Sequence, residues 1–190
     1  MRVSEQSVRR PVRAVALGVG AILIAFLVVL AVTHSGAKES AESNLLGKPA
    51  PMVEAELLGG GKFNLSYRKG SWVILNFFNS TCVPCVREHP ELVKFAQAES
   101  GQDEPAEIYT VINDDSDSAV RAFFDENGGD WPKVKDDNGT IAVAFGVAKV
   151  PETWIVDPNG FVRMRITGEI SMDFLNETMS NFRLQASGAG

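Results

Sequence analysis

The sequence predicts an α/β fold in which a mixed central sheet carries helices on both faces. A near-continuous apolar run at residues 71–78 is suited to a strand buried on both faces, and a helix-compatible segment at 86–99 and a second strand at 106–112 follow it. Two strands separated by a helix imply a parallel pair. Strand candidates at 152–156 and 161–166 form a late hairpin, which adds antiparallel strands and makes the sheet mixed.

The flanking segments complete this arrangement. Short strand candidates at 52–58 and 62–65 surround three consecutive glycines, so we expect a β-hairpin extension before the sheet. Residues 118–127 have a helical pattern that Gly128-Gly129 closes. The remaining expectations are a loop or short extended piece at 131–137, a short helix at 139–145, a tight turn at 157–160 and a terminal helix capped by Ser171 that runs to about residue 185.

The amino-terminal region predicts a membrane anchor. Residues 14–32 contain no charged side chain, and as a helix they span roughly 28 Å, close to the thickness of a bilayer's hydrocarbon core, about 30 Å. Residues 1–13 carry four arginines against one glutamate, which places the amino terminus in the cytoplasm and the rest of the chain outside, as a single-pass protein of the cell membrane. The alternative is a cleaved signal peptide with small residues at 35–37; both interpretations export the domain.

The remaining chain divides into a tether, one domain and a tail. Residues 33–44 are small and polar and predict a flexible tether, residues 45–186 a single domain, and residues 187–190 a disordered tail. The net charge is −6 for all 190 residues and +3 for residues 1–32, so the remainder carries −9. This acidity argues against a nucleic-acid partner and against docking on anionic lipid headgroups.

The chain has two cysteines, Cys82 and Cys85, placed where the buried strand becomes a helix. A disulfide that closes so short a loop removes little entropy from the unfolded chain, so redox chemistry explains the pair better than stabilisation. If the helix begins around Cys82, the positive end of its dipole lowers the pKa of that thiol. Cys85 then lies nearly one turn further on and more buried, so we expect Cys82 to attack and Cys85 to resolve. Pro84 falls in the first turn, where no N–H is needed.

Two other interpretations of the cysteines stay open at this point. One is an inert disulfide or a pair of unreactive thiols. The other is a zinc site completed by His34 and His89, although these residues lack the spacing of a metal knuckle. We expect no metal and no cofactor, and we take His89 as a surface residue without a role.

Several short motifs resemble a known family. They are Cys-Val-Pro-Cys-Val-Arg-Glu-His-Pro at 82–90, Phe-Gly-Val at 145–147, Val-Pro-Glu-Thr-Trp-Ile-Val-Asp at 150–157 and Asn-Gly at 159–160. Over roughly residues 45–185 the chain resembles the membrane-tethered thioredoxin-like proteins of the TlpA/ResA/DsbE (CcmG) group. These are thiol–disulfide oxidoreductases, many of which reduce apocytochrome c before haem attachment. The resemblance implies a thioredoxin-like fold for this domain.

The resemblance also implies roles for particular residues. Pro151 matches the family's cis-proline, which lies beside the two cysteines and lets the preceding residue, Val150, pair with a substrate chain; Pro84 joins Val150 as a substrate-binding residue. Glu88 matches an acid near the thiols that exchanges a proton with the resolving cysteine. Without the resemblance, Pro151 reads as a trans-proline on an edge strand, and Glu88 as a solvated acid on a helix.

The sequence departs from the family pattern at two positions. Thioredoxin proper has an aspartate six residues before the first cysteine; Asn76 stands there and cannot relay a proton, which increases the reliance on Glu88. The tryptophan that commonly precedes the first cysteine is replaced by Thr81, which leaves a smaller and more polar rim.

These observations predict an extracytoplasmic thiol–disulfide oxidoreductase that acts as a monomer. The expected partners are a protein disulfide substrate such as apocytochrome c and a membrane thiol electron donor of the CcdA/DsbD type. An oxidant or isomerase for the folding of exported proteins is the alternative within the same chemistry. A metal or copper carrier and a non-catalytic interaction module are the alternatives from other classes.

Overall fold

The computed structural model describes residues 15, 17–26, 28 and 43–188. The chain forms two units, residues 1–37 and 38–190, which we treat separately. Residues 17–26 are helical. Among the residues just given, no helix is long and apolar enough to cross a membrane. The predicted anchor at 14–32 and tether at 33–44 fall partly outside them and stay predictions.

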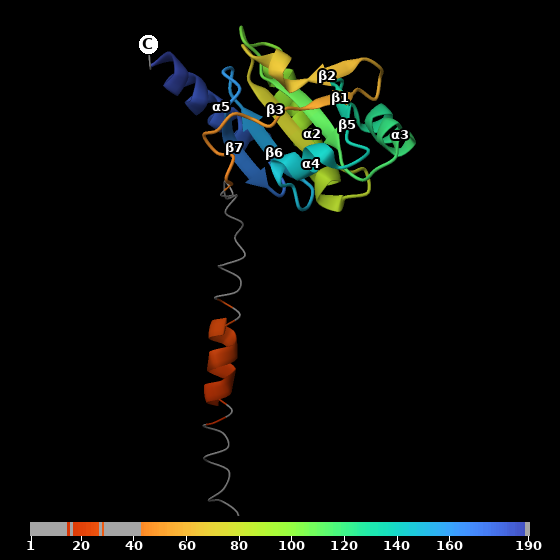
Figure 1. Ribbon diagram of the computed structural model, residues 1–190. Coiled ribbons are helices and arrows are strands. Elements are labelled where there is room, and N and C mark those ends of the chain that lie inside the picture. Colours follow the sequence, from red (N-terminus) through yellow and green to blue (C-terminus); the bar gives the residue numbers. More distant parts are fainter. Residues whose placement is uncertain (1–14, 16, 27, 29–42, 189–190) are drawn as a thin grey trace, which may run out of the picture. The chain divides into compact units, whose positions relative to one another are not determined.

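The larger unit contains the elements of an α/β domain in the predicted order (Figure 1). In chain order they are β1 (Glu54–Glu56), β2 (Lys62–Asn64), the 3₁₀ turn η1 (Leu65–Arg68), β3 (Val73–Phe78), α2 (Val83–Glu99), β4 (Glu107–Ile112), α3 (Asp117–Asn127), β5 (Lys133–Lys135), α4 (Thr140–Phe145), β6 (Glu152–Val156), β7 (Val162–Thr167) and α5 (Met172–Ser187).

The central sheet has five strands in the order β5-β4-β3-β6-β7. Strand β4 is parallel to β3 and β5, whereas β6 is antiparallel to both β3 and β7, so the predicted mixed sheet is confirmed. The structure adds a parallel strand, β5, within the stretch at 131–137 that we expected as a loop or short extended piece. The predicted hairpin of β1 and β2 also forms, and Leu57 bridges Val134 of β5, so the hairpin lies against that edge of the sheet (Figure 1).

Alternation along β3 divides the core into two layers. Leu75 and Phe77 pack with Phe145 of α4 and Phe63 of the hairpin on one face. The opposite face of the sheet packs against α2 and α5 and, around Phe78, against α3. Helices therefore cover both faces, as predicted, and α2, which begins at the two cysteines, lies on the face that contains most of them.

The ends of the helices follow the local chemistry of the sequence. The Ser171 hydroxyl accepts the Phe174 N–H and caps α5, as predicted, and α5 runs two residues further than expected, to Ser187. Gly128 ends α3 with a positive φ of 77°, a backbone conformation that favours glycine. The helix α2 continues through Pro90.

We predict that Gly129→Ala destabilises the domain more than Gly128→Ala does. Both glycines have positive φ, which costs an alanine roughly 1–2 kcal/mol. A Cβ on Gly129 also meets the rings of Trp131 at 3.0 Å and of His89 and Phe124 at 3.1 Å, whereas one on Gly128 meets nothing within 4 Å. Because these rings are packed together, the extra cost at Gly129 should be about 1–3 kcal/mol. Urea unfolding of both variants tests this, and equal losses of stability would contradict it.

Candidate active site

The turn between β3 and α2 is fixed by hydrogen bonds to the end of β4. The Asn79 side-chain amide donates to the carbonyl oxygens of Asn113 and Asp114, at 3.0 and 2.7 Å, and its oxygen accepts the Thr81 N–H at 2.8 Å. The Asp115 carboxylate accepts the Ser80 N–H. The chain is thereby held in place immediately before the first cysteine.

The two cysteines form a disulfide at the start of α2, as the sequence predicted. Cys82 is the N-cap residue, and its Sγ accepts the Cys85 N–H at 3.3 Å. Cys82 is partly exposed, whereas Cys85 is completely buried. Pro84 occupies the second position of the helix, where a missing N–H removes no helical hydrogen bond.

The peptide bond between Val150 and Pro151 is cis, as expected from the resemblance. The antiparallel register of β3 and β6 pairs Phe77 with Glu152. Pro151 therefore lies at the carboxyl-terminal end of β3, from which the chain leads to Cys82. Val150 and Cys82 both pack against the apolar cluster that contains Cys85. The topology thus brings the predicted substrate-binding residues and the cysteines together at this end of the sheet.

Glu88 is buried, with only 1% of its surface exposed, so the interpretation as a solvated helix acid is wrong. It lies three residues after Cys85 in α2, and residues at this spacing are neighbours on a helix. The Asn76 side-chain amide donates to its Oε1 at 2.8 Å, and the Ile170 N–H donates to its Oε2 at 3.1 Å. Hydrogen bonds to both oxygens favour the ionised carboxylate, against the penalty of burial.

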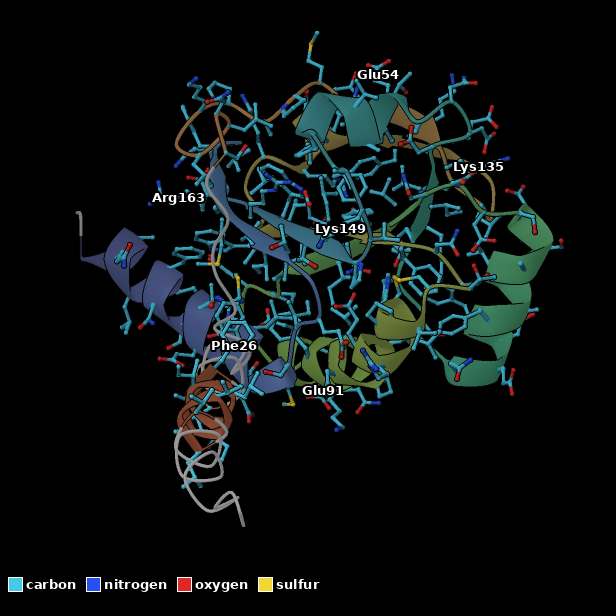
Figure 2. The ribbon with its side chains drawn as sticks, turned by 90° about the horizontal axis from the view of Figure 1, so that it is seen from below. Phe26, Glu54, Glu91, Lys135, Lys149 and Arg163 are labelled. Atoms are coloured by element: carbon cyan, nitrogen blue, oxygen red, sulfur yellow. A yellow bond between two sulfur atoms is a disulfide. The ribbon has the colours of Figure 1, made fainter. Side chains whose placement is uncertain are left out.

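Sequence reasoning missed the connection between β7 and α5 as a part of this site. Its first residue, Gly168, donates its N–H to the Pro151 carbonyl oxygen at 2.9 Å. Arg87 of α2 pairs with Glu169, and Glu91, visible on α2 in Figure 2, accepts the Met172 N–H at 3.1 Å. The connection therefore joins the active-site helix to the cis-proline, and no motif in the sequence indicates these backbone contacts.

A second buried carboxylate follows the cis-proline. Glu152 is 1% exposed and forms an ion pair with Arg165 at 3.0 Å, and its Oε1 accepts the indole N–H of Trp154 at 2.8 Å. The pairing with Arg165 compensates the charge of this carboxylate.

The described ranges, 15, 17–26, 28 and 43–188, contain no group of three or more His, Cys, Asp or Glu side chains placed to hold a metal ion. His34, one of the two histidines in the zinc hypothesis, lies outside these ranges.

Most of the domain matches the sequence model of one protein family. The model of the AhpC/TSA family matches residues 46–165, which is more than half of the chain. The chain belongs to the AhpC/TSA family. The thioredoxin-like fold and the thiol–disulfide oxidoreductase class of enzyme expected from the motifs are confirmed.

Individual proteins similar to this AhpC/TSA-family chain are named for thiol–disulfide exchange. The thiol:disulfide interchange protein HelX of Rhodobacter capsulatus is 33% identical over 136 residues, 70% of this chain and 74% of HelX. The thiol-disulfide oxidoreductase ResA of Bacillus subtilis is 30% identical over 139 residues, 73% of this chain and 76% of ResA. The crystal structure of the thioredoxin domain of a thiol-disulfide oxidoreductase from Bacteroides vulgatus superposes with a TM-score of 0.63 at 26% identity, over 74% of this chain and 99% of that one.

His89, which we expected on the surface of this AhpC/TSA-family domain, is buried, and that expectation is wrong. Its ring packs against Phe123, Phe124 and Trp131, with centroids 4.8–5.6 Å away. Its Nε2 lies 3.0 Å from the Gly128 carbonyl oxygen and must donate, because a carbonyl only accepts. Burial lowers the pKa of His89.

We predict that the stability of the domain falls as the pH drops below about 6.5, the ordinary pKa of histidine. The unfolded chain takes up a proton there, whereas the folded state resists it because burial lowers the pKa of His89. The contribution of neutral His89 to the free energy of unfolding is thus complete above about pH 6.5 and is lost as the pH falls toward the lower folded-state pKa. The free energy of unfolding should change by at most about 1.4 kcal/mol per pH unit in this range.

Urea unfolding between pH 5 and 7.5 measures this slope. The control is His89→Gln, whose side-chain amide can donate to Gly128 but does not titrate, so its slope should be smaller. Identical slopes in the two proteins would show that His89 does not cause the pH dependence.

Proposed function

We propose that this protein reduces disulfides of exported proteins, and that its substrate is the disulfide between the haem-binding cysteines of apocytochrome c. The Cys82 thiolate attacks one sulfur of the substrate disulfide and forms a mixed disulfide, while the substrate's S–S bond breaks and its other sulfur leaves as a thiolate that takes a proton from water. Cys85 then attacks the Cys82 sulfur, which restores the Cys82–Cys85 disulfide and releases the substrate as a dithiol.

The observation that carries the order of attack is the different exposure of the two sulfurs. Cys82 is partly exposed and lies at the amino end of α2, where the Cys85 N–H that bonds its Sγ and the helix dipole stabilise a thiolate. Cys85 is fully buried within an apolar cluster, which disfavours its thiolate. A folded substrate protein therefore reaches Cys82 first.

The other predicted residues support this reaction. Glu88 is a buried carboxylate one turn after Cys85, and it accepts the proton that Cys85 loses when it attacks. The backbone at Val150, next to the cis-proline, pairs with the extended substrate chain on either side of its cysteines.

The cellular part of the proposal rests on the sequence and on the relatives. The apolar stretch at 14–32 and the arginines before it support a single-pass anchor in the cell membrane, with this domain outside the cytoplasm. A membrane thiol electron donor of the CcdA/DsbD type then reduces the Cys82–Cys85 disulfide after each turnover. The identity to ResA and HelX, named as a thiol-disulfide oxidoreductase and a thiol:disulfide interchange protein, supports the exchange chemistry of this cycle.

We predict that Cys85→Ser traps a mixed disulfide between Cys82 and the substrate, because the resolving sulfur is missing. Expressed as the full chain, this variant should accumulate an adduct with apocytochrome c that dithiothreitol releases. The adduct is identified by non-reducing electrophoresis and mass spectrometry. Cys82→Ser is the matched control and should trap nothing.

Adducts with many unrelated exported proteins, and none with apocytochrome c, would contradict the proposed substrate. The reduction potential tests the direction of electron flow. A value near or above roughly −120 mV would identify an oxidant rather than a reductant.

A further inference from the structure

Asn76 is a polar residue in the middle of a strand that is buried on both faces. It lies in β3 between Leu75 and Phe77, and only 1% of its surface is exposed. Burial of a carboxamide is unfavourable unless it forms hydrogen bonds. An apolar residue would suit β3 better, so the contacts of Asn76 indicate why the amide is present.

The side-chain amide nitrogen of Asn76 has two partners from different elements. It donates to Oε1 of Glu88 in α2 at 2.8 Å and to the hydroxyl oxygen of Thr153 in β6 at 3.1 Å. Thr153 follows the cis-proline by two residues and is completely buried. Asn76 therefore links the carboxylate near Cys85 to the strand that begins at Pro151.

The carbonyl end of the same side chain is used differently. Among the residues that the structure describes, Oδ1 of Asn76 is the buried side-chain nitrogen or oxygen atom without a hydrogen-bond partner. A carboxamide that served packing alone would have both ends satisfied. Here the amide nitrogen donates two hydrogen bonds while the oxygen stays unpaired. The fold therefore needs a hydrogen-bond donor at this position, and the charged group that accepts from it is Glu88.

The second oxygen of Glu88 is held from the opposite side. The Ile170 N–H donates to Oε2, and Gly168, two residues earlier, donates to the Pro151 carbonyl oxygen at 2.9 Å. Asn76 and the segment of Ile170, which donate to Glu88, thus also contact the residues at or just after the cis-proline. The carboxylate is fixed in position between the resolving cysteine and the substrate-binding turn.

We propose that Asn76 is a positioning residue that keeps Glu88 ionised and correctly placed to accept the proton of Cys85. This inference rests on the proposed role of Glu88. In the resolving step the Cys85 thiol gives its proton to Glu88, and the resulting thiolate forms a bond to the Cys82 sulfur. The bond between Cys82 and the substrate sulfur breaks, and the substrate sulfur leaves with the electron pair and takes a proton from water.

Other charged or titratable groups lie on the elements packed around Glu88. They are Arg87, His89, Glu91, Lys94 and Glu99 on α2, Glu152 on β6, Arg163 and Arg165 on β7, Glu169 in the following connection, and Asp173, Glu177 and Arg183 on α5. Of these, Arg87 pairs with Glu169, and Arg165 with Glu152. Asn76 takes part in neither pair, so we expect its substitution to leave both in place and a change in the titration of Glu88 to report on the lost amide.

The test compares Asn76→Leu, which removes the donor at similar volume, with the wild type as full-length chains. Loss of a hydrogen bond to a charged group should move the acid limb of the resolving rate to higher pH by about one to two units. Single-turnover reduction of a disulfide peptide, followed from pH 5 to 9, gives this limb. The attack step, measured in the Cys85→Ser background, should change less than about two-fold, because it does not use Glu88.

Two further measurements test the effect on Glu88 without relying on turnover and distinguish it from a general loss of stability. The ¹³Cδ resonance of Glu88 in the oxidised protein should titrate at higher pH in Asn76→Leu than in the wild type. Thr110→Val is the matched control: Thr110 is a buried polar residue that pairs with Asn76 in the sheet register, but its hydroxyl accepts from Trp131. This variant should leave both pH midpoints unchanged.

The outcomes separate the two proposals. Loss of the acid limb in Glu88→Gln supports the role of Glu88. If Asn76→Leu then keeps the wild-type acid limb and the wild-type ¹³Cδ midpoint of Glu88, the role of Asn76 is refuted. If Glu88→Gln itself retains the wild-type profile, the proton-accepting role of Glu88 fails, and the inference about Asn76 fails with it. Equal shifts in Asn76→Leu and Thr110→Val would assign the effect to loss of core stability and overturn the inference.

Discussion

The start of α2 at Cys82 is the constraint on which the rest of the site depends. Asn79 holds the preceding turn against the end of β4, so the helix begins with the cysteine as its N-cap. This places one sulfur at the helix terminus, where it accepts the Cys85 N–H, and carries Cys85 into the apolar core. The position of Glu88, one turn further, follows from the same start. A shift of the helix start by one residue would rotate all three side chains by about 100° and separate them from their partners.

The sequence predicted the strands and the cysteine chemistry well because both have strong local signals. The apolar run of β3 and the tight turn before β7 can be recognised without tertiary information. Strand β5 was expected only as a loop or short extended piece because it has three residues, of which Val134 alone is buried, too few to show a period. The approach of Pro151 to the cysteines depends on the antiparallel register of β3 and β6. A motif can suggest that contact by resemblance, whereas residue spacing cannot derive it.

Burial of polar residues on α2 was the part that sequence reasoning could not resolve. Glu88 and His89 both have side chains that are usually exposed, and acids are common along this helix. Their partners are backbone groups of remote loops, the N–H of Ile170 and the carbonyl of Gly128, which have no sequence signature. Asn76 did carry a signal, since an amide inside a strand buried on both faces requires hydrogen-bond partners.

The two sulfurs are held in environments that separate the two steps of exchange. The helix terminus stabilises the thiolate of Cys82, so the first attack needs no proton acceptor in the protein. In the proposed mechanism, burial keeps Cys85 as a thiol, so a proton is removed only when the mixed disulfide is resolved, and a carboxylate acts at that point alone. The fold maintains that carboxylate at a cost to stability: an unpaired buried acceptor such as Oδ1 of Asn76 costs about 1–3 kcal/mol. Against a net stability of roughly 5–15 kcal/mol for a typical domain, such a cost is substantial, and the proposed role of Glu88 as the base that speeds release of the substrate accounts for it.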